Sequence, residues 1–377
     1  MDYTIDRRGW QLQPAYDFQE YMAPVSSFPM AYVYATFLGI SGHILGRNAY
    51  LMYGAHEMYT NQYIALLGGS GTHHKSTALK AAMRLQGTER LEATPPLRAL
   101  TTEQGLLTAM NNTGGHALVV LDEIANMLSK KKQDFGASLL SQLVNLYDCP
   151  DEAGNYTKYD PTIVTEPYVT FMSASTMEWL RDSLSTNDML AGFGNRMTWV
   201  LGDPRKPKAF PTPINTVDAP EIFNQLEMFS GEVVLTEEAR DRWEHHYYEF
   251  LDIQKASPPF LQVMAERLTD KALKAAIINA AWDDSHYIEI EHLERGIDWT
   301  NYLHDCLKVM LPTFGSKEQT ILASLSNGRD TKRKLYNEHG HKAGYTADTI
   351  KRSLDSLLAL GVIATAGKRY VIVDKPE

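Results

Sequence analysis

Apolar residues in the middle of the chain fall into short continuous runs that are separated by segments of helical composition. Tyr63–Leu67 and Ala117–Leu121 are apolar or aromatic at every position, which is typical of strands buried on both faces of a parallel sheet. The segment after the first run is rich in helix-forming residues. This alternation predicts an α/β fold for residues 61–205. The predicted elements are strand 63–67, helix 76–86, helix 103–112, strand 117–121, helix 137–147 and strand 168–173.

The N-terminal segment, residues 1–60, is predicted to be mostly helical and to pack on the α/β core. A break is expected between Pro24 and Pro29, because proline cannot continue a helix. The stretch 30–40 that follows is apolar and rich in small residues, so we expect it to lie against the core.

A proline-rich connector over 205–213 marks the end of the core. The next predicted domain covers residues 206–312, and its part from 218 onward is expected to be helical throughout. Its strongest helix is predicted over Leu261–Trp282, and another is predicted from about 291 to 310.

The last predicted module covers residues 315–377 and combines three helices with a β-hairpin, which is the plan of a winged helix. Thr346 is a plausible N-cap of the third helix, and Ala366-Gly367 is expected at the turn of the hairpin. The predicted elements are helices over 317–325, 332–339 and 346–360 and a hairpin over 362–373.

Composition agrees with a globular cytoplasmic protein of two or three domains. Of the 377 residues, 44% are hydrophobic and 22% are charged. We find neither an apolar stretch of membrane-spanning length nor a secretory leader at the N-terminus, and therefore expect no membrane partner. Cys149 and Cys306 form no disulfide framework, and the histidines lack the spacing of a zinc site.

Charge is distributed unevenly between the body and the last module. The chain has a net charge of −10, but residues 315–377 hold eleven Lys/Arg against seven Asp/Glu, which gives +4 there and leaves −14 on the rest. We therefore predict that the winged helix contacts DNA phosphates, with protein contacts or autoregulation as the alternative. The predicted DNA contacts are Lys351 and Arg352 on the third helix and Lys368 and Arg369 on the wing.

A glycine-rich segment at 68–77 resembles the phosphate-binding P-loop G-x-x-x-x-G-K-[ST], except that His74 stands in place of the last glycine. A strand precedes it and a helix follows, so backbone N–H groups at the helix start can hold an anion. Lys75 would reach the β- and γ-phosphates, and Ser76 would ligate Mg²⁺. The alternative is a turn without a ligand. The predicted phosphate-binding residues are Gly69, Ser70, Gly71, Thr72, His73, His74, Lys75, Ser76 and Thr77.

The second apolar strand ends in a carboxylate pair, Asp122-Glu123. Ligands of open α/β sheets bind at the carboxyl ends of the strands. Asp122 is therefore predicted to hold Mg²⁺, and Glu123 to act as the general base toward an attacking water. The alternative is an acidic pair that opens the next helix.

Three segments together resemble the AAA+ ATPases: the loop 69–76, the strand end 119–123 and Ala191-Gly192-Phe193-Gly194-Asn195-Arg196. Within that group the chain is similar to helicase-like and primase-helicase-type ATPases of phages and mobile elements, which share the plan of MCM helicases. MCM-type P-loops also lack the last glycine. The resemblance covers about residues 20–312. It implies an AAA+ P-loop core over 61–205, a helical lid over 206–312 and the winged helix over 315–377.

The resemblance also implies roles for further residues. Ser173 or Ser175, at the end of the third strand, would sense the γ-phosphate or the attacking water, and the choice between them stays open. Arg196 would act on the nucleotide of a neighbouring subunit, with a salt bridge inside its own subunit as the alternative. Arg267 would be the second sensor, although Lys271 and Lys274 compete for that role.

Two loops are candidate DNA contacts, because MCM-like rings project a hairpin into the central pore at this point of the chain. Lysines would bind the phosphate backbone and a tyrosine could stack on bases. A solvated loop is the alternative for both. The residues are Lys130, Lys131 and Lys132 in the first loop and Tyr156 and Lys158 in the second.

The sequence thus predicts an ATP- and Mg²⁺-dependent DNA helicase or translocase of a phage or mobile element, acting as a homo-oligomeric ring, expected to be a hexamer. Single-stranded DNA would lie in the pore, the winged helix would hold duplex DNA, and a primase would come from a partner. The alternative is a helicase loader, a replication initiator or an ATP-gated regulator. A nucleotide kinase is disfavoured, since it needs neither a lid nor a winged helix.

Overall fold

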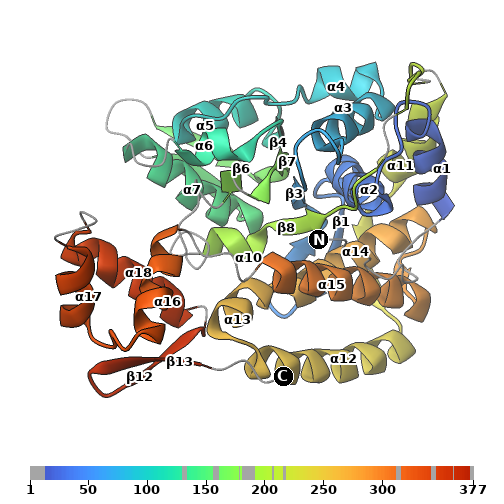
Figure 1. Cartoon of the computed structure of the whole chain (residues 1–377). Helices are drawn as coiled ribbons and strands as arrows, with labels where there is room; N and C mark the ends of the chain where they lie inside the picture. The colour runs from blue at the N-terminus through green and yellow to red at the C-terminus, as the bar shows by residue number, and fades with distance from the viewer. Residues whose placement is uncertain are drawn as a thin grey trace.

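The protein has a mixed α/β fold built on a parallel sheet, as predicted (Figure 1). The computed structural model describes residues 13–129, 134–155, 161–177, 179–180, 192–205, 208–214, 218–310, 316–340, 345–359 and 361–373. Up to the last strand of the sheet, the elements are α1 (Gln13–Met22), α2 (Met30–Leu45), β1 (Ala49–Tyr53), β2 (His56–Tyr59), β3 (Tyr63–Leu67), α3 (Lys75–Leu85), α4 (Thr88–Ala93), α5 (Glu103–Asn111), β4 (His116–Leu121), α6 (Ile124–Ser129), α7 (Asp134–Tyr147), β5 (Glu152–Asn155), β6 (Thr162–Thr165), β7 (Tyr168–Ser175), α10 (Gly194–Arg196) and β8 (Thr198–Leu201).

A second group of elements, mainly helical, follows the sheet. Among the described residues no helix is both long and apolar enough to cross a membrane. The elements are η3 (Ala219–Phe223), α11 (Asn224–Met228), β9 (Gly231–Glu232), β10 (Val234–Leu235), α12 (Glu237–Ala256), α13 (Pro259–Ala265), α14 (Leu268–Trp282), β11 (Tyr287–Ile288), α15 (Ile290–Met310), α16 (Ser316–Ser326), α17 (Lys332–His339), α18 (Ala347–Ala359), β12 (Ile363–Ala366) and β13 (Arg369–Ile372).

The central sheet has four parallel strands in the order β4-β7-β3-β8. β7 comes later in the chain than β4, but it pairs between β3 and β4. A single parallel bridge between Leu97 and Val119 extends the sheet beyond β4. The carboxyl ends of β3, β4 and β7 therefore lie next to one another, and the loops that follow them share one edge of the sheet.

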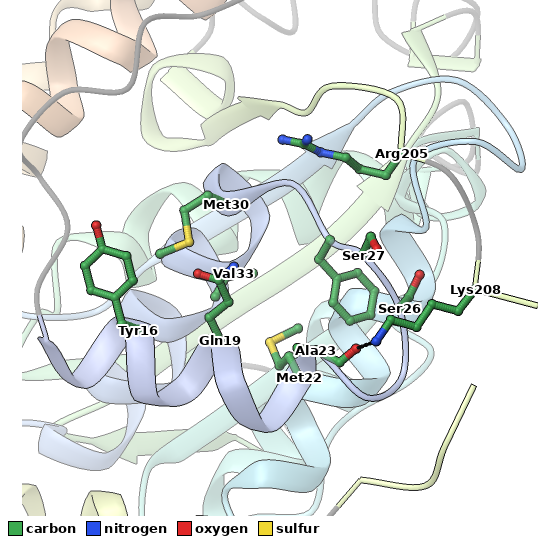
Figure 2. A pocket seen from close by; sticks show the side chains of 11 residues that line it. Tyr16, Gln19, Met22, Ala23, Ser26, Ser27, Met30, Val33, Arg205 and Lys208 are labelled. Atoms are coloured by element: carbon green, nitrogen blue, oxygen red, sulfur yellow. Dashed lines mark hydrogen bonds between the residues drawn. The ribbon is translucent and has the colours of Figure 1, made fainter. Parts of the chain in front are cut away.

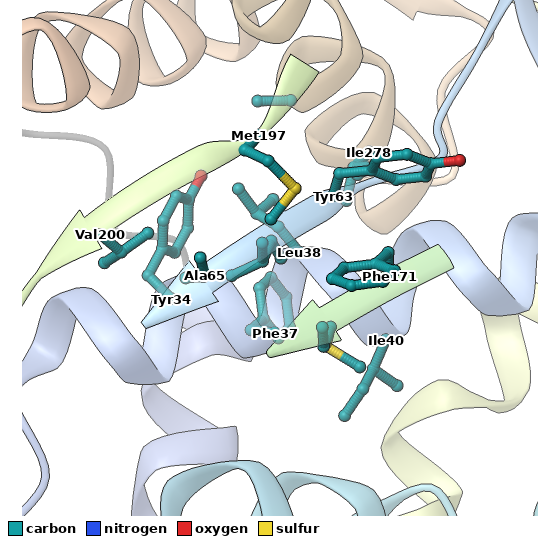
Figure 3. Packing of buried hydrophobic residues seen from close by; sticks show 14 of the residues in the cluster. Tyr34, Phe37, Leu38, Ile40, Tyr63, Ala65, Phe171, Met197, Val200 and Ile278 are labelled. Atoms are coloured by element: carbon teal, nitrogen blue, oxygen red, sulfur yellow. The ribbon is translucent and has the colours of Figure 1, made fainter. Parts of the chain in front are cut away.

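The hydrophobic core lies where α2, the sheet and α14 meet. α2 is apolar around almost its whole circumference, which is typical of a helix buried on all sides. Figure 3 shows its side chains Phe37 and Leu38 against Ala65 of β3 and Phe171 of β7, with Ile278 of α14 close to the same cluster. The prediction that the stretch 30–40 packs on the core is confirmed.

The predictions for the two helical regions are wrong in three places. Residues 49–59 form an antiparallel hairpin, in which Tyr50 pairs with Tyr59 across a turn at Gly54, because large apolar side chains favour strands over helices there. The helix predicted over Leu261–Trp282 is divided into α13 and α14. Arg267 is the N-cap residue of α14, and Asp270 in the first turn favours a new helix start. Short strands β9, β10 and β11 also interrupt the region that was expected to be all helical.

The last module has the predicted three helices and hairpin (Figure 1). Its buried apolar side chains form a hydrophobic cluster separate from the main core. Thr346 caps α18, since its hydroxyl accepts a hydrogen bond from the Thr349 N–H at 3.1 Å. The predicted turn is displaced by one residue. Ala366 pairs with Arg369, so that the turn is Gly367-Lys368.

The close approach of α15 to α14 depends on Gly296. A Cβ atom at this position would lie 2.3 Å from the Ala272 carbonyl oxygen, which is backbone and cannot rotate away. We predict that Gly296→Ala lowers the free energy of unfolding by about 1–3 kcal/mol, as overpacking does. Denaturant unfolding measures the change. Glu291→Ala, an exposed change in the same helix, is the control and should cost below about 1 kcal/mol. Equal stability of the two variants would contradict the packing argument.

Candidate functional site

The loop between β3 and α3 turns sharply at the residue before the helix. His74 is the N-cap residue of α3 and has a left-handed backbone, with φ 53° and ψ 30°. Residues other than glycine adopt this conformation at a cost, although histidine adopts it more often than most. The position thus requires a positive φ, which accounts for the glycine that the motif usually has there. The Nε2 atom of His74 is buried without a hydrogen-bond partner.

Lys75 is folded back onto the loop. Its side chain is nearly buried, and Nζ donates hydrogen bonds to the carbonyl oxygens of Gly68 and Gly69, each at 2.9 Å. Both acceptors are neutral, so an anion in the loop would compete favourably for this ammonium group. The lysine is therefore positioned at the start of the loop, where the P-loop prediction needs it.

His73 covers the glycines that begin the loop. A Cβ atom on Gly68 would lie 2.4 Å from the His73 ring and 2.8 Å from the Tyr32 hydroxyl, so only glycine fits at this position. Burial of the ring, and then the nearby Lys75 ammonium, lower the pKa of His73 below its ordinary value. A neutral ring results, which adds no second positive charge beside Lys75.

Ser76, in the helix after β3, contacts Asp122, which follows β4, at the carboxyl end of the sheet. The Ser76 hydroxyl donates to the Asp122 backbone carbonyl at 3.4 Å, and the Asp122 carboxylate forms a 2.9 Å ion pair with Lys80. Both side chains of this ion pair are about half exposed, so it is weak and exchangeable. The hydroxyl and the carboxylate are hard oxygen ligands of the kind that Mg²⁺ prefers, and a nucleotide would supply further oxygens.

No group of three or more His, Cys, Asp or Glu in the described residues could by itself hold a metal ion. Mg²⁺ in nucleotide sites is typically bound through one or two carboxylates plus substrate phosphates. The residues present therefore fit a nucleotide-bound Mg²⁺.

The two candidate serines have different partners. The Ser175 hydroxyl donates to Oε1 of Glu123, which also accepts the Ala125 N–H at 3.2 Å. Ser173 instead donates to the Ile64 carbonyl at 3.0 Å, inside the sheet. Leu121 pairs with Ser173, so Glu123 is level with Ser175. Ser175 therefore contacts the candidate site through Glu123, whereas the Ser173 hydroxyl bonds within the sheet.

The two candidate arginines lie at the other end of the sheet. Arg196 precedes β8, whose first residue, Thr198, pairs with Ile64, whereas the P-loop begins after Leu67. Arg196 forms a 2.6 Å ion pair with Asp148, and Arg267 contacts the same carboxylate at 3.1 Å. The salt bridge inside the subunit, the alternative for Arg196, is therefore present. Arg267 contacts Asp148 and does not reach the P-loop of its own chain.

Lys271 and Lys274, which competed with Arg267 as sensors, are buried structural residues. Lys271 Nζ donates to the Asn195 and Met197 carbonyls at 2.8 and 2.7 Å, and Lys274 Nζ donates to Asn61 Oδ1 at 2.5 Å. Burial lowers the pKa of both, to about 7 for Lys271. Neither ammonium faces the candidate phosphate site.

A pocket of about 280 Å³ lies beside the P-loop (Figure 2). The Arg205 N–H donates to the Thr72 carbonyl at 3.0 Å, which joins the pocket wall to the loop. Figure 2 shows Arg205 and Lys208 opposite Tyr16 and Gln19 of α1. The sequence did not indicate this pocket, because segments nearly 190 residues apart in the chain form its walls.

Two polar atoms of this pocket have no hydrogen-bond partner among the residues that the structure describes. The Ser26 hydroxyl and the Arg205 Nε atom are buried without a hydrogen bond, and the Ser26 residue is only 4% exposed. Buried polar groups are normally paired, so these two atoms are available to hydrogen-bond a molecule that enters the pocket. Apolar side chains supply part of the remaining wall, namely Met22, Phe28, Met30 and Val33.

The predicted DNA contacts are described only in part. Lys351 and Arg352 are exposed on α18, Lys368 is exposed in the hairpin turn, and Arg369 is exposed and pairs with Asp330 at 3.5 Å. Strands β5 and β6 pair antiparallel, and in the sequence they flank the loop of the predicted pore hairpin. The loop residues themselves lie outside the described residues, as does the lysine cluster. They are Tyr156, Lys158, Lys130, Lys131 and Lys132.

Comparison of the chain with models of protein families and with curated protein sequences gave no match. The geometry of the site therefore carries the functional argument.

The left-handed conformation of His74 predicts that glycine stabilises this position more than alanine does, which is the reverse of the order inside a helix. His74→Gly should be more stable than His74→Ala by about 1 kcal/mol, because only glycine adopts this conformation without strain. Lys80, exposed in the middle of α3, provides the control pair. There the alanine variant should be more stable than the glycine variant by about 1 kcal/mol. Thermal unfolding of the four variants tests this, and the same order at both positions would contradict it.

Proposed function

We propose that the protein is an ATPase of the AAA+ type that works as an oligomeric ring and moves or unwinds DNA. The observation that supports this best is the convergence of five side chains at one edge of the parallel sheet. Lys75 and Ser76 follow β3, Asp122 and Glu123 follow β4, and Ser175 ends β7. These are the groups that phosphate binding, metal binding and water activation require.

The triphosphate would bind in the loop before α3. Backbone N–H groups at the start of α3 face the anion, and the helix dipole favours its charge. Lys75 would exchange the carbonyls of Gly68 and Gly69 for phosphate oxygens. Ser76 and Asp122 would hold Mg²⁺, which neutralises phosphate charge when bound.

Glu123 would accept the proton of the attacking water. Its carboxylate is half-buried and is oriented by the Ser175 hydroxyl and the Ala125 N–H. A base that two donors hold in one rotamer needs no rearrangement before it acts. Ser175 would thus position the base and sense the state of the γ-phosphate.

The pocket of Figure 2 would hold the base and ribose of the nucleotide. It adjoins the P-loop through Arg205 and combines apolar walls with the unpaired Ser26 hydroxyl. Such a mixture of apolar surface and few polar groups is typical of small-molecule sites.

The ring and DNA parts of the proposal rest on other features. Arg196 lies too far along the sheet to serve the nucleotide of its own chain, which favours action on a neighbouring subunit. The three helices and hairpin at the C-terminus would be the winged helix that binds duplex DNA, and the β5–β6 hairpin would enter the pore. A primase would be a partner. The alternative function is a loader, initiator or ATP-gated regulator, which would hold DNA without unwinding it.

The decisive experiment combines ATP hydrolysis with strand displacement. The purified protein should hydrolyse ATP faster with DNA present and should displace a paired strand. Glu123→Gln should keep nucleotide binding but lose at least about 100-fold in hydrolysis, since the amide keeps the shape and not the basicity. Glu92→Gln, an exposed change on α4, should have no effect. Turnover by Glu123→Gln would refute the catalytic assignment, and hydrolysis without displacement would favour the loader.

The two serines provide a matched pair. Ser175→Ala should lower hydrolysis by at least about tenfold with little change in nucleotide affinity, because it removes a donor that orients Glu123. Ser173→Ala should leave hydrolysis nearly intact and lower stability by about 1 kcal/mol, since its hydroxyl bonds only within the sheet. Single-turnover kinetics and thermal unfolding measure the two effects. Reversed results would mean that Ser173 is the sensor.

A further inference from the structure

Three segments that are far apart in the sequence bring two guanidinium groups onto one carboxylate. Asp148 follows α7, Arg196 ends the turn before β8, and Arg267 begins α14. Asp148 Oδ2 is 2.6 Å from Arg196 Nη2, and Oδ1 is 3.1 Å from Arg267 Nη1. Each carboxylate oxygen thus binds a different arginine.

Hydrogen bonds to the backbone on either side of Arg196 hold the main chain of this turn in place. Lys271 Nζ donates to the carbonyls of the residues on either side, Asn195 and Met197. The Asn195 amide in turn donates to Glu266 at 3.0 Å. Arg196 can therefore exchange its side-chain partner without moving its main chain.

The carboxylate is more accessible than the arginine it binds. Its side chain is 43% exposed, whereas that of Arg196 is 11% exposed and has a buried Nε atom without a partner. Asp148 and Arg267 also line a cavity of about 720 Å³ between the β1–β2 hairpin and α14. A group that approaches from outside could reach this carboxylate and take its place.

A carboxylate that bridges two guanidinium groups mimics a bound phosphate. Phosphate oxygens accept the same paired N–H donors, and phosphate carries more charge than a carboxylate. Without an anion between them, the two positive groups would repel each other, and one of them is largely buried. The position of Asp148 therefore has to be filled by an anion.

We propose that Arg196 and Arg267 form one anion site, that Asp148 fills it in the free subunit, and that a phosphate of a neighbouring copy's nucleotide replaces Asp148 on assembly. The inference rests on the proposed function for the source of the phosphate. The nucleotide of the same chain is excluded as the source, because its P-loop lies at the opposite end of the sheet. Asp148 is then a positioning residue that keeps the two arginines together.

Inorganic phosphate tests the anion site without any ATPase activity. All variants carry Lys75→Ala, which removes the response of the P-loop to phosphate. Adding Asp148→Ala should lower the melting temperature in chloride, and phosphate at equal ionic strength should restore it by several degrees beyond the shift of the Lys75→Ala parent. The parent measures the general effect of phosphate on protein surfaces.

Two controls make the phosphate effect specific. Adding Arg196→Ala to the Asp148→Ala chain should abolish the extra shift, because half of the site is gone. Asp270→Ala removes the other carboxylate of Arg267, which it contacts at 3.1 Å, and should create no extra phosphate response. Asp148→Asn keeps the shape of the side chain and substitutes for Asp148→Ala if that chain does not fold. Equal phosphate shifts in all variants would overturn the proposal.

ATP hydrolysis, measured in chains that keep Lys75, then tests whether a neighbouring copy's phosphate replaces Asp148. Asp148→Asn should reach half-maximal ATPase activity at a severalfold lower protein concentration than the wild type, because no internal carboxylate competes with the neighbour's phosphate. An unchanged or higher concentration would overturn the exchange. A chain without ATPase activity would refute the proposed function, while the phosphate measurement would still decide whether the anion site exists.

Discussion

The pairing of β7 between β3 and β4 is the constraint on which the candidate site depends. Parallel pairing on both edges of β7 fixes the register of the two neighbouring strands. Leu67 of β3 pairs with Ser175, and Leu121 of β4 pairs with Ser173. The glycine-rich loop after β3, the carboxylate pair and the polar end of β7 consequently meet at one edge without any direct link in the sequence. α2 on one side of the strands makes this arrangement rigid, because it buries apolar side chains against β3, β7 and β8.

Local patterns were sufficient for the elements of the site but not for its contacts. β3 and β4 could be predicted because they contain continuous apolar runs, and Lys75 and Glu123 because short motifs mark them, whereas β8 was not predicted. The sequence could not decide which of Ser173 and Ser175 lies at the site. Both lie on the same face of one strand, and only the register of that strand against β4 distinguishes them. That register is set between residues 52 positions apart in the chain, as the pairing of Leu121 with Ser173 shows. The pocket beside the P-loop was missed for the same reason, because its walls come from both ends of the core.

α14 shows how a helix that looks apolar in sequence can also carry charge. Its alanines let α15 approach closely, while Lys271 and Lys274 extend from the same helix into the protein and bond to carbonyl and amide oxygens. The low pKa of Lys271, about 7, means that burial removes much of its charge near neutral pH. A neutral amine still has two N–H groups for its two carbonyl acceptors. Lys271 thus ties the helical region to the turn that presents Arg196, and Lys274 ties it to Asn61, just before β3.

The C-terminal module has a hydrophobic cluster built only from its own residues, among them Ile321, Leu335, Leu354 and Ile363. A separate cluster of this kind is typical of a cooperative unit within a larger structure. Substitutions in it would be tolerated or rejected by its own stability, independently of the phosphate site. The module could therefore diverge, or be exchanged for another of similar size, while the core stays unchanged. Over evolutionary time, the surface that this module presents could therefore change faster than the loops at the carboxyl ends of the parallel strands.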